Sequence, residues 1–360
     1  MTDPLMFIGS QIRSGGDGPD AIGVFRFNDT DGSMLRLGSV GGIDNPTWLT
    51  VDAGRRRLYA ASEMPEWSEG TVSAYEIDAA SGSLRYLNKQ STRGNCTCHL
   101  GISADGKYLA AANYAAQPEV DGPDQAVAFY RLGDAELAPA SGGARHPGHS
   151  VLPDRQARSH GHCCYFTPDG KRLFVADLGL DRLVAYDIGA AGELTPAPRF
   201  DAVFEPGRGP RHIASHPDGR TLFVVHELKP GISVASLEAD GTPVLSTVDF
   251  VYPTQVYPSA VQVSADGRFV YAMVRVTGDV IALEVGADRS VREIGRWPCG
   301  ATWPRDARLS PSGKFLLVAN QDGNKLTVFK RDVANGQLGD VATELELPTP
   351  MCIAFLGVEG

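Results

Sequence analysis

The sequence predicts an all-β fold, a single seven-bladed β-propeller domain covering residues 1–360 with four antiparallel strands in each blade. A short motif, a D-G or S-G turn between runs of β-branched and aromatic residues, recurs along the chain, and almost no segment shows helical periodicity. The intervals between the turn glycines lie in the range that is typical of propellers. These glycines are Gly54, Gly106, Gly170, Gly219, Gly267 and Gly313.

Each repeat contains four runs that read as strands. The first run precedes the turn and the second follows it, as in HPDGRTLFVVHEL (216–228). A third run comes next, for example ISVASL (232–237), and then a less regular fourth run, for example SLRYL (83–87). Four short antiparallel strands are the content of one propeller blade.

The last blade needs both ends of the chain. Six copies of the repeat are complete, but PTPMCIAFL (348–356) is not followed by a turn and a second strand. The N-terminal segment LMFIGSQ (5–11) has the character of the missing strand. We therefore predict that the N-terminal strand closes the ring, which gives seven blades and removes a free sheet edge.

The longest interval between turn glycines, from Gly106 to Gly170, holds the polar segment SGGARHPGHSVLPDRQARS (141–159). Long connections in compact repeats are often functional. We expect an irregular loop in this part of the chain.

The formal net charge of −10 argues against nucleic acid and against an anionic membrane as partners, because both require an extended basic surface. A small anionic substrate is still compatible with it. The N-terminus lacks the pattern of a secretory signal, and the spacing of the six cysteines is not that of a disulfide scaffold. We expect reduced thiols and a cytoplasmic location. The sequence does not indicate an oligomeric state.

Polar and charged residues gather at one predicted mouth of the channel. The innermost strand of a blade pairs antiparallel with the second, so the start of one lies beside the end of the other. This rule places Arg211 opposite Glu227, and it predicts that Arg275 shares their mouth. Such varied, ionisable side chains favour a functional site, although polar rim residues can also simply hydrogen-bond bulges and channel water. The same rule adds His99, Asn113, His160, His162, Asp177, Arg305 and Asn320 to this mouth.

Three motifs resemble those of the seven-bladed lactonase family, which includes the propeller-type bacterial 6-phosphogluconolactonases and the fungal 3-carboxymuconate cyclases. They are SHGHCCYFTPDGKRLFVADLGLDRL (159–183), GPRHIASHPDGRTLFVVHEL (209–228) and PRDARLSPSGKFLLVANQDGN (304–324). The resemblance extends over essentially the whole chain. It implies the propeller fold and an enzyme that acts on a lactone or forms one.

The resemblance also implies a catalytic set of one histidine, two arginines and one glutamate. Carried over by motif, these are His160 (or His162), Arg211, Glu227 and Arg275. The other polar residues of the mouth are then expected to bind substrate. These are His99, Asn113, His162, Asp177, Arg305 and Asn320.

These residue types suit the hydrolysis of a sugar-acid lactone of the 6-phosphogluconolactone type. Glu227 would act as general base or acid, and His160 would share in proton transfer. Arg211 and Arg275 would hold the substrate's anionic group and the oxyanion. We expect a small anionic or hydroxylated lactone as substrate, with no cofactor and no metal. We also expect these charges to lie at a wet mouth and to contribute little to folding.

Three other interpretations use the same mouth. Cycloisomerisation of a carboxymuconate needs the same arginines, base and acid. A metal-dependent aldonolactonase would draw on oxygen ligands, for which the candidates are Asn113, Asp177, Glu227 and Asn320. A non-catalytic propeller would bind a protein or sugar through an aromatic rim, with Trp48, Trp67, Trp297 and Trp303 as the candidates.

Overall fold

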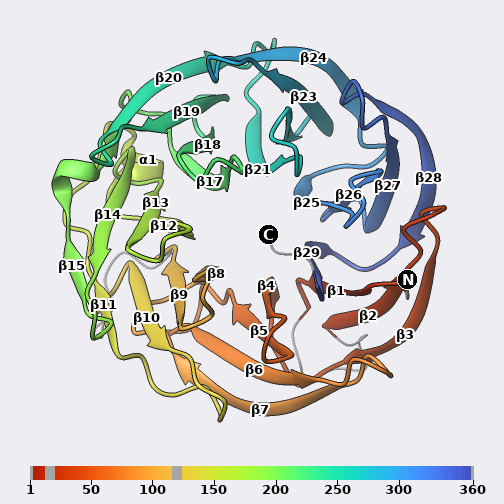
Figure 1. Ribbon diagram of the computed structural model, residues 1–360, viewed down its shortest axis with the longest axis horizontal. Helices are drawn as coiled ribbons and strands as arrows, with labels where there is room; N and C mark the ends of the chain where they lie inside the picture. The colour runs from red at the N-terminus through yellow and green to blue at the C-terminus, as the bar shows by residue number, and fades with distance from the viewer. Residues whose placement is uncertain (1–2, 13–20, 116–123, 358–360) are drawn as a thin grey trace.

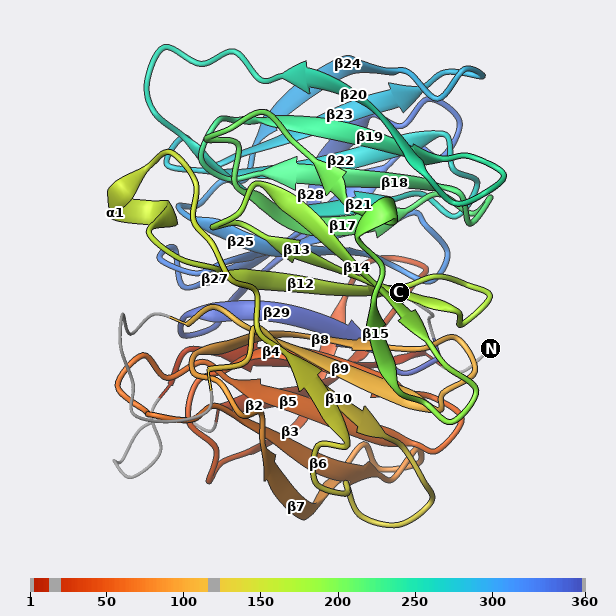
Figure 2. The ribbon, with the colours of Figure 1, turned by 90° about the vertical axis from the view of Figure 1, so that its left-hand side faces the viewer.

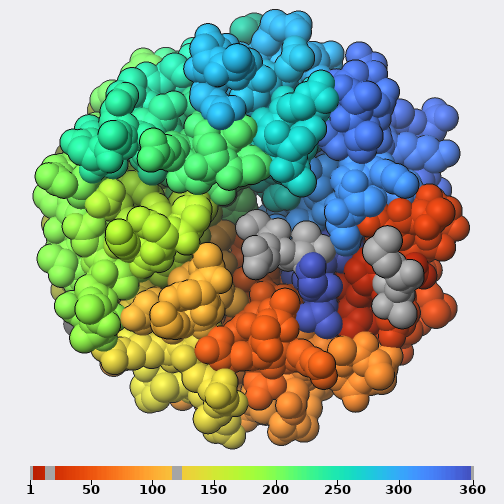
Figure 3. Space-filling model, viewed as in Figure 1, coloured from red at the N-terminus to blue at the C-terminus, as the bar shows by residue number. Residues whose placement is uncertain are grey.

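The computed structural model describes residues 3–12, 21–115 and 124–357. It shows seven antiparallel sheets arranged in a ring around a central channel (Figure 1). Six sheets have four strands, and one has a fifth, short strand that pairs with its third. In Figure 3, which shows the molecule from the same side, the surface is hollowed at the centre of the ring. The predicted seven-bladed propeller is confirmed.

The blades follow one another along the chain, and within each blade the strands are ordered from the channel outward. The first comprises β29 (Pro350–Phe355), β1 (Leu5–Ser10), β2 (Ile22–Phe27) and β3 (Met34–Val40). The second comprises β4 (Pro46–Asp52), β5 (Arg57–Ser62), β6 (Thr71–Ile77) and β7 (Leu84–Ser91). The third comprises β8 (Thr97–Ile102), β9 (Tyr108–Asn113), β10 (Val127–Arg131) and β11 (Gly142–Ala144).

The fourth blade comprises β12 (Gly161–Phe166), β13 (Arg172–Asp177), β14 (Arg182–Ile188), β15 (Leu194–Pro196) and the short β16 (Ala202–Val203). The fifth comprises β17 (Pro210–Ser215), β18 (Thr221–His226), β19 (Gly231–Leu237) and β20 (Pro243–Asp249). The sixth comprises β21 (Tyr257–Val263), β22 (Phe269–Arg275), β23 (Asp279–Val285) and β24 (Val291–Pro298). The seventh comprises β25 (Pro304–Leu309), β26 (Phe315–Asn320), β27 (Lys325–Arg331) and β28 (Leu338–Glu346).

The N-terminal strand closes the ring, as predicted. β1 pairs on one side with β2 and on the other with β29, where Met6 lies opposite Phe355 and Ile8 lies opposite Ile353. Every residue of β1 is buried. The first blade is therefore built from both ends of the chain, and its innermost strand comes from the C-terminal end.

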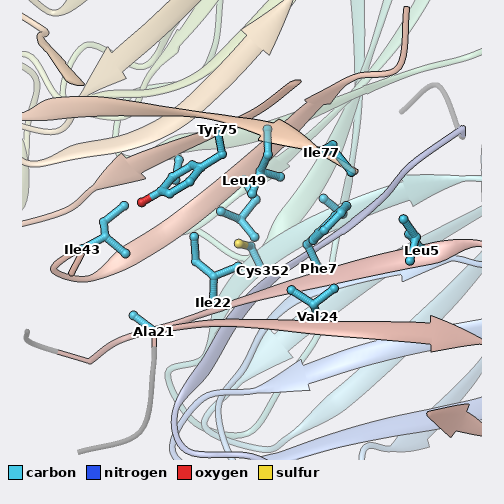
Figure 4. Close-up of a cluster of buried hydrophobic side chains, with 13 residues drawn as sticks. Leu5, Phe7, Ala21, Ile22, Val24, Ile43, Leu49, Tyr75, Ile77 and Cys352 are labelled. Atoms are coloured by element: carbon cyan, nitrogen blue, oxygen red, sulfur yellow. The ribbon is translucent and has the colours of Figure 1, made fainter. Parts of the chain in front are cut away.

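The core lies between neighbouring blades. Figure 4 shows one such cluster, in which Phe7 of the first blade and Leu49 of the second pack with Cys352. Further clusters of this kind fill the other interfaces around the ring. Because both faces of a blade are buried, the second and third strands are continuous apolar runs and do not alternate with polar residues.

The recurring turns join the first and second strands of the blades. Gly106, for example, has a φ of 67°, a left-handed conformation that glycine adopts without a Cβ clash. The second blade differs, because the left-handed residue is Arg56, with a φ of 52°, and not the predicted Gly54.

The long connection between the third and fourth blades contains the helix α1 (Pro153–Gln156), and a 3-10 turn (Pro198–Phe200) lies in the fourth blade. Figure 2 shows α1 projecting on the side of the ring from which β29 starts. Within the described ranges, no helix is both long enough and apolar enough to cross a membrane.

Candidate active site

A β-bulge near the start of each innermost strand directs side chains into one end of the channel. In β17, Pro210 and His212 pair with consecutive residues of β18, so Arg211 between them has no partner in the ladder. Bulges of this kind re-aim a side chain. The residues at single-residue bulges of the other blades are Thr47, Cys98, His162, Arg305 and Met351.

Most of these bulged residues meet in a small cavity inside the channel. The cavity has a volume of about 10 Å³, close to the space that one water molecule needs. The lining residues are Thr47, Trp48, Cys98, Arg211, His212, Arg305 and Met351. The bulges of different blades thus converge on one point.

Three guanidinium groups surround the carboxylate of Glu227. Arg211 Nε donates to Oε2 over 2.9 Å, and Arg275 Nη2 lies 2.7 Å from the same oxygen. Arg155 Nη2 donates to Oε1 over 2.6 Å. The proximity of Arg211 and Glu227 inferred from the strand pairing is therefore present, and Arg275 contacts Glu227 directly.

This cluster is buried, and the expectation of a wet mouth is wrong. The side chains of Arg211 and Glu227 are 1% and 8% exposed. Burial alone would raise the pKa of Glu227, but Arg275 and Arg211 outweigh it and hold that pKa well below its ordinary value. Glu227 is ionised at neutral pH, and with these neighbours in place it is a weak base.

The two deeper arginines are held by backbone carbonyls as well as by Glu227. Arg211 Nη1 donates to Ser259 O over 2.5 Å, and Arg275 Nε donates to Tyr257 O over 3.0 Å. Burial and the nearby cations lower the pKa of Arg211 to about 9, which still leaves it charged at neutral pH. Both guanidinium groups are consequently fixed in direction before any substrate arrives.

The cluster carries an excess of positive charge. Three guanidinium groups face one carboxylate, and the neighbouring Arg305 has its own partner, Glu63, at 2.8 Å. Two cations are thus left without a counter-charge, in a chain whose formal net charge is −10. A site of this kind attracts a small anion, because its local electrostatic field is positive although the field of the whole protein is negative.

His160 lies beside this cluster but does not touch it. Its ring stacks on Tyr114 at 4.4 Å, and its Nδ1 lies 2.5 Å from the carbonyl oxygen of the same tyrosine. Nδ1 must donate this hydrogen bond, so the neutral ring has its lone pair on Nε2. Burial lowers the pKa of His160, which keeps the ring neutral at neutral pH.

His162 is electrostatically closer to Glu227 than His160 is. Burial and Arg211 lower the pKa of His162, and the same ring helps to lower the pKa of Glu227. Its Nδ1 is buried and has no hydrogen-bond partner in the described part of the chain. His212 lies 5.3 Å away, edge to face, and accepts a hydrogen bond from Arg211. Of the two histidines that the sequence proposed, His162 therefore faces the guanidinium cluster more directly.

His99 lies deeper in the channel. Its Nδ1 accepts a hydrogen bond from the backbone of Cys164, and its ring packs against Trp48 at 4.1 Å. Burial lowers its pKa to about 3, so the ring is neutral.

Asn113, Asp177 and Asn320 are fully buried and hydrogen-bond within their own blades or to the connections that lead into them. Asn113 accepts a hydrogen bond from Thr97 and donates to backbone carbonyls, and Asn320 donates to Thr327. The substrate-binding role predicted for these three residues stays a prediction, and their hydrogen bonds in this structure are architectural.

The oxygen ligands proposed for a metal do not form a common set. Glu227 is engaged by arginines, whereas Asp177 accepts hydrogen bonds from His146 and Ser159, each over 2.6 Å. Among the described residues, no group of three or more His, Cys, Asp or Glu side chains is arranged to hold a metal ion. The tryptophans proposed for an aromatic rim are all partly buried.

Sequence reasoning missed Arg155 as a partner of the site. Arg155 belongs to α1, and its Nη2 also lies 3.5 Å from the hydroxyl of Tyr114. The length of the 141–159 segment marked this loop as a candidate for function. Nothing in its local pattern shows that Arg155, and not one of its neighbours, reaches Glu227.

Fold and site together define a β-propeller with an arginine-rich pocket at one mouth of its channel. Residues 6–355 match the family described as "Lactonase, 7-bladed beta-propeller", and the chain belongs to this family. It is 29% identical to a 6-phosphogluconolactonase of Bacillus subtilis, with 99% of each chain covered. It is also 29% identical to a 6-phosphogluconolactonase of Formosa agariphila, with 94% of this chain and 96% of the relative covered.

A solved structure, the periplasmic gluconolactonase of Pseudomonas aeruginosa, is 31% identical and superposes with a TM-score of 0.89, with 99% of each chain covered. The resemblance seen in the motifs is therefore confirmed at the level of the family.

Proposed function

We propose that this protein hydrolyses a sugar-acid lactone of the 6-phosphogluconolactone type at the Glu227 cluster. The observation that carries the proposal is the pair of uncompensated guanidinium charges around a buried carboxylate. A phosphorylated lactone carries charge of the opposite sign, and its carbonyl develops a further negative charge during hydrolysis. Relatives in the family carry the names 6-phosphogluconolactonase and gluconolactonase, which supports the same chemistry for this chain.

The proposed reaction begins with a water molecule between Glu227 and the lactone carbonyl. Glu227 accepts a proton from the water, whose oxygen then attacks the carbonyl carbon. Arg211 and Arg275 stabilise the resulting oxyanion, because their guanidinium groups are already oriented by backbone carbonyls.

Collapse of the tetrahedral intermediate breaks the bond between the carbonyl carbon and the ring oxygen. The leaving alkoxide takes up a proton, and the product is the open hydroxy acid. The proton that Glu227 took from the water is the one delivered: we assign its transfer to His160, whose Nε2 lone pair accepts it and passes it to the alkoxide while Nδ1 stays bonded to Tyr114. His162 shapes the electrostatics of the same pocket.

We also propose that the protein acts in the cytoplasm. Its six cysteines are all unpaired and buried, which fits a reducing compartment. Cell fractionation of the source organism tests this, and recovery in a periplasmic or secreted fraction would contradict it.

A substrate panel tests the proposed reaction. The purified protein is assayed with 6-phosphogluconolactone, unphosphorylated gluconolactone and 3-carboxymuconate, before and after exhaustive treatment with EDTA. We expect the phosphorylated lactone to be hydrolysed most efficiently and its rate to survive EDTA. If the protein converts the muconate to a lactone and hydrolyses neither gluconolactone, it is a cycloisomerase and not a hydrolase. Loss of activity on chelation, restored by calcium, would show that a metal is required.

A further inference from the structure

The structure shows a conflict between the state of Glu227 and the role proposed for it. Both carboxylate oxygens are occupied, Oε1 by Arg155 and Oε2 by Arg211 and Arg275. A carboxylate in this environment has little affinity for a proton, and Oε1 already accepts a charge-assisted hydrogen bond from Arg155. Efficient general-base catalysis requires at least one of these ion pairs to open.

Arg155 is the partner that can leave. Its side chain is 37% exposed, compared with 1% for Arg211 and 7% for Arg275. Arg211 and Arg275 are also bound to backbone carbonyls of the sixth blade, whereas both hydrogen bonds of Arg155 use Nη2 alone. In the described part of the chain, the Nε and Nη1 groups of Arg155 have no acceptor.

The position of Arg155 also suits an anion that arrives from solvent. The residue lies on α1, which projects on one side of the ring (Figure 2), and its guanidinium group contacts Glu227 Oε1 while the side chain stays 37% exposed. Arginine binds a phosphate dianion through two parallel hydrogen bonds, from Nη2 together with either Nε or Nη1, so the fork of Arg155 becomes complete when Nη2 leaves Glu227.

We propose that Arg155 is a phosphate-sensing specificity residue, which exchanges its ion pair with Glu227 for one with the substrate's phosphate and thereby frees Oε1 to accept a proton from water. This inference rests on the proposed lactonase function. The exchange couples recognition to catalysis, because an unphosphorylated lactone does not draw Arg155 away. Arg211 and Arg275 stay in place throughout and serve the oxyanion.

The decisive experiment compares Arg155→Gln with wild type on phosphorylated and unphosphorylated gluconolactone. We expect the ratio of the two kcat/KM values to fall about tenfold or more in the variant, the usual size of a lost hydrogen bond to a charged group. Arg145→Gln is the matched control, because Arg145 is an exposed arginine of the same loop, and it should keep the wild-type ratio. An Arg155→Gln variant that keeps this ratio, or loses both activities by the same factor, overturns the inference.

A second measurement separates sensing from simple electrostatic attraction. Phosphite dianion added together with the unphosphorylated lactone should raise the turnover of wild type and of Arg145→Gln, but not that of Arg155→Gln. Absence of activation in wild type contradicts the exchange.

The inference and the proposed function fail in different ways. If neither lactone is hydrolysed above the spontaneous rate, the proposed function is wrong. Titration calorimetry with inorganic phosphate then tests Arg155 on its own. Tighter binding by wild type and Arg145→Gln than by Arg155→Gln supports a phosphate site, and equal binding by all three overturns it.

Discussion

At the scale of single residues, the site is a balance between one buried anion and several cations. Glu227 is stable as a carboxylate because Arg211 and Arg275 outweigh the cost of its burial. The same pairing lowers the proton affinity of Glu227, so substrate binding has to open one of its ion pairs before Glu227 can act as a base. The charges at this mouth therefore serve both the fold and the chemistry.

Glu227→Gln should lose turnover and stability together. Without the carboxylate, three guanidinium groups would face one another in a buried site, and we expect a clear fall in Tm. Loss of the base should reduce kcat by about a hundredfold or more. Thermal melts and steady-state kinetics measure the two effects. Added phosphate should stabilise the variant more than wild type, and a variant with normal kcat would remove Glu227 from the mechanism.

Arg211→Lys keeps the charge but loses the planar fork. The lysine cannot reach Glu227, His212 and the carbonyl of Ser259 together. We expect kcat to fall by about a hundredfold, the usual cost of losing one oriented donor to an oxyanion. Circular dichroism should show an intact propeller. Near-normal turnover would mean that charge alone is sufficient at this position.

At the scale of elements, the loop that carries Arg155 is anchored to the fourth blade by two buried carboxylates, Asp177 and, through Ser150, Asp181. Asp177 accepts hydrogen bonds from His146, from Ser159 and from the backbone N–H of His160. The hydrogen bonds to His146 and Ser159 tie down the two ends of the segment that contains α1. The position of Arg155 thus depends on a residue at the end of β13, outside the guanidinium cluster.

Asp177→Asn should loosen this loop. The amide keeps the shape but weakens charge-assisted hydrogen bonds, so we expect a lower Tm and faster proteolysis within residues 142–160. KM for the phosphorylated lactone should rise more than kcat falls, because Arg155 is held less firmly. Asp340→Asn, a change at an exposed position, is the control. Unchanged proteolysis of the loop would show that Asp177 is not one of its anchors.

At the scale of the whole molecule, stability depends on closing the ring. β1 contributes an inner position of the first blade, and Phe7 packs between that blade and the second (Figure 4). An open ring would expose the edges of β2 and β29. The N-terminal strand is thus part of the core although it is the first strand in the chain.

Phe7→Ala should destabilise the propeller by about 3–5 kcal/mol, the usual cost of removing a buried aromatic side chain. Deletion of residues 1–11 should have a larger effect and promote aggregation through the open edge. Urea unfolding and size-exclusion chromatography measure these outcomes. Val251→Ala, at a side chain that is 80% exposed, is the control. A deletion variant with the wild-type Tm would contradict closure by β1.

The stability of the molecule should also fall as the pH drops below about 6.5. Burial lowers the pKa of His99 and of His226 to about 3 from an ordinary value of 6.5, and it holds the pKa values of His162 and His212 well below that ordinary value. At a pH between the lowered pKa of the folded protein and the ordinary pKa of the unfolded chain, the unfolded chain binds more protons than the folded one. Acid therefore favours unfolding. Each histidine adds a slope of about 1.4 kcal/mol per pH unit.

Urea unfolding between pH 7 and pH 5 measures this slope. His226→Gln should reduce it by about one histidine's share, and His149→Gln, at an exposed position, is the matched control. Stability that does not change over this range would contradict the neutral state of the buried histidines.

The sequence alone determined the number of blades, the order of their strands and the closure of the ring by the N-terminal strand, predicted within residues 5–11. These features follow from local turn chemistry and from apolar runs that repeat along the chain, and both can be read without knowing the neighbours in space. The meeting of Arg211 and Glu227 was also predictable, because they lie at adjacent ends of two paired strands.

Only the tertiary structure decided which side chains complete the site. Arg155 reaches Glu227 from another blade's loop, and a one-residue bulge turns Arg211 into the channel. Burial of the cluster, which overturned the expected wet mouth, likewise depends on the packing of several blades around it. Contacts between distant segments depend on the curvature of the whole ring and on single-residue shifts in register, and neither leaves a periodic signal in the chain.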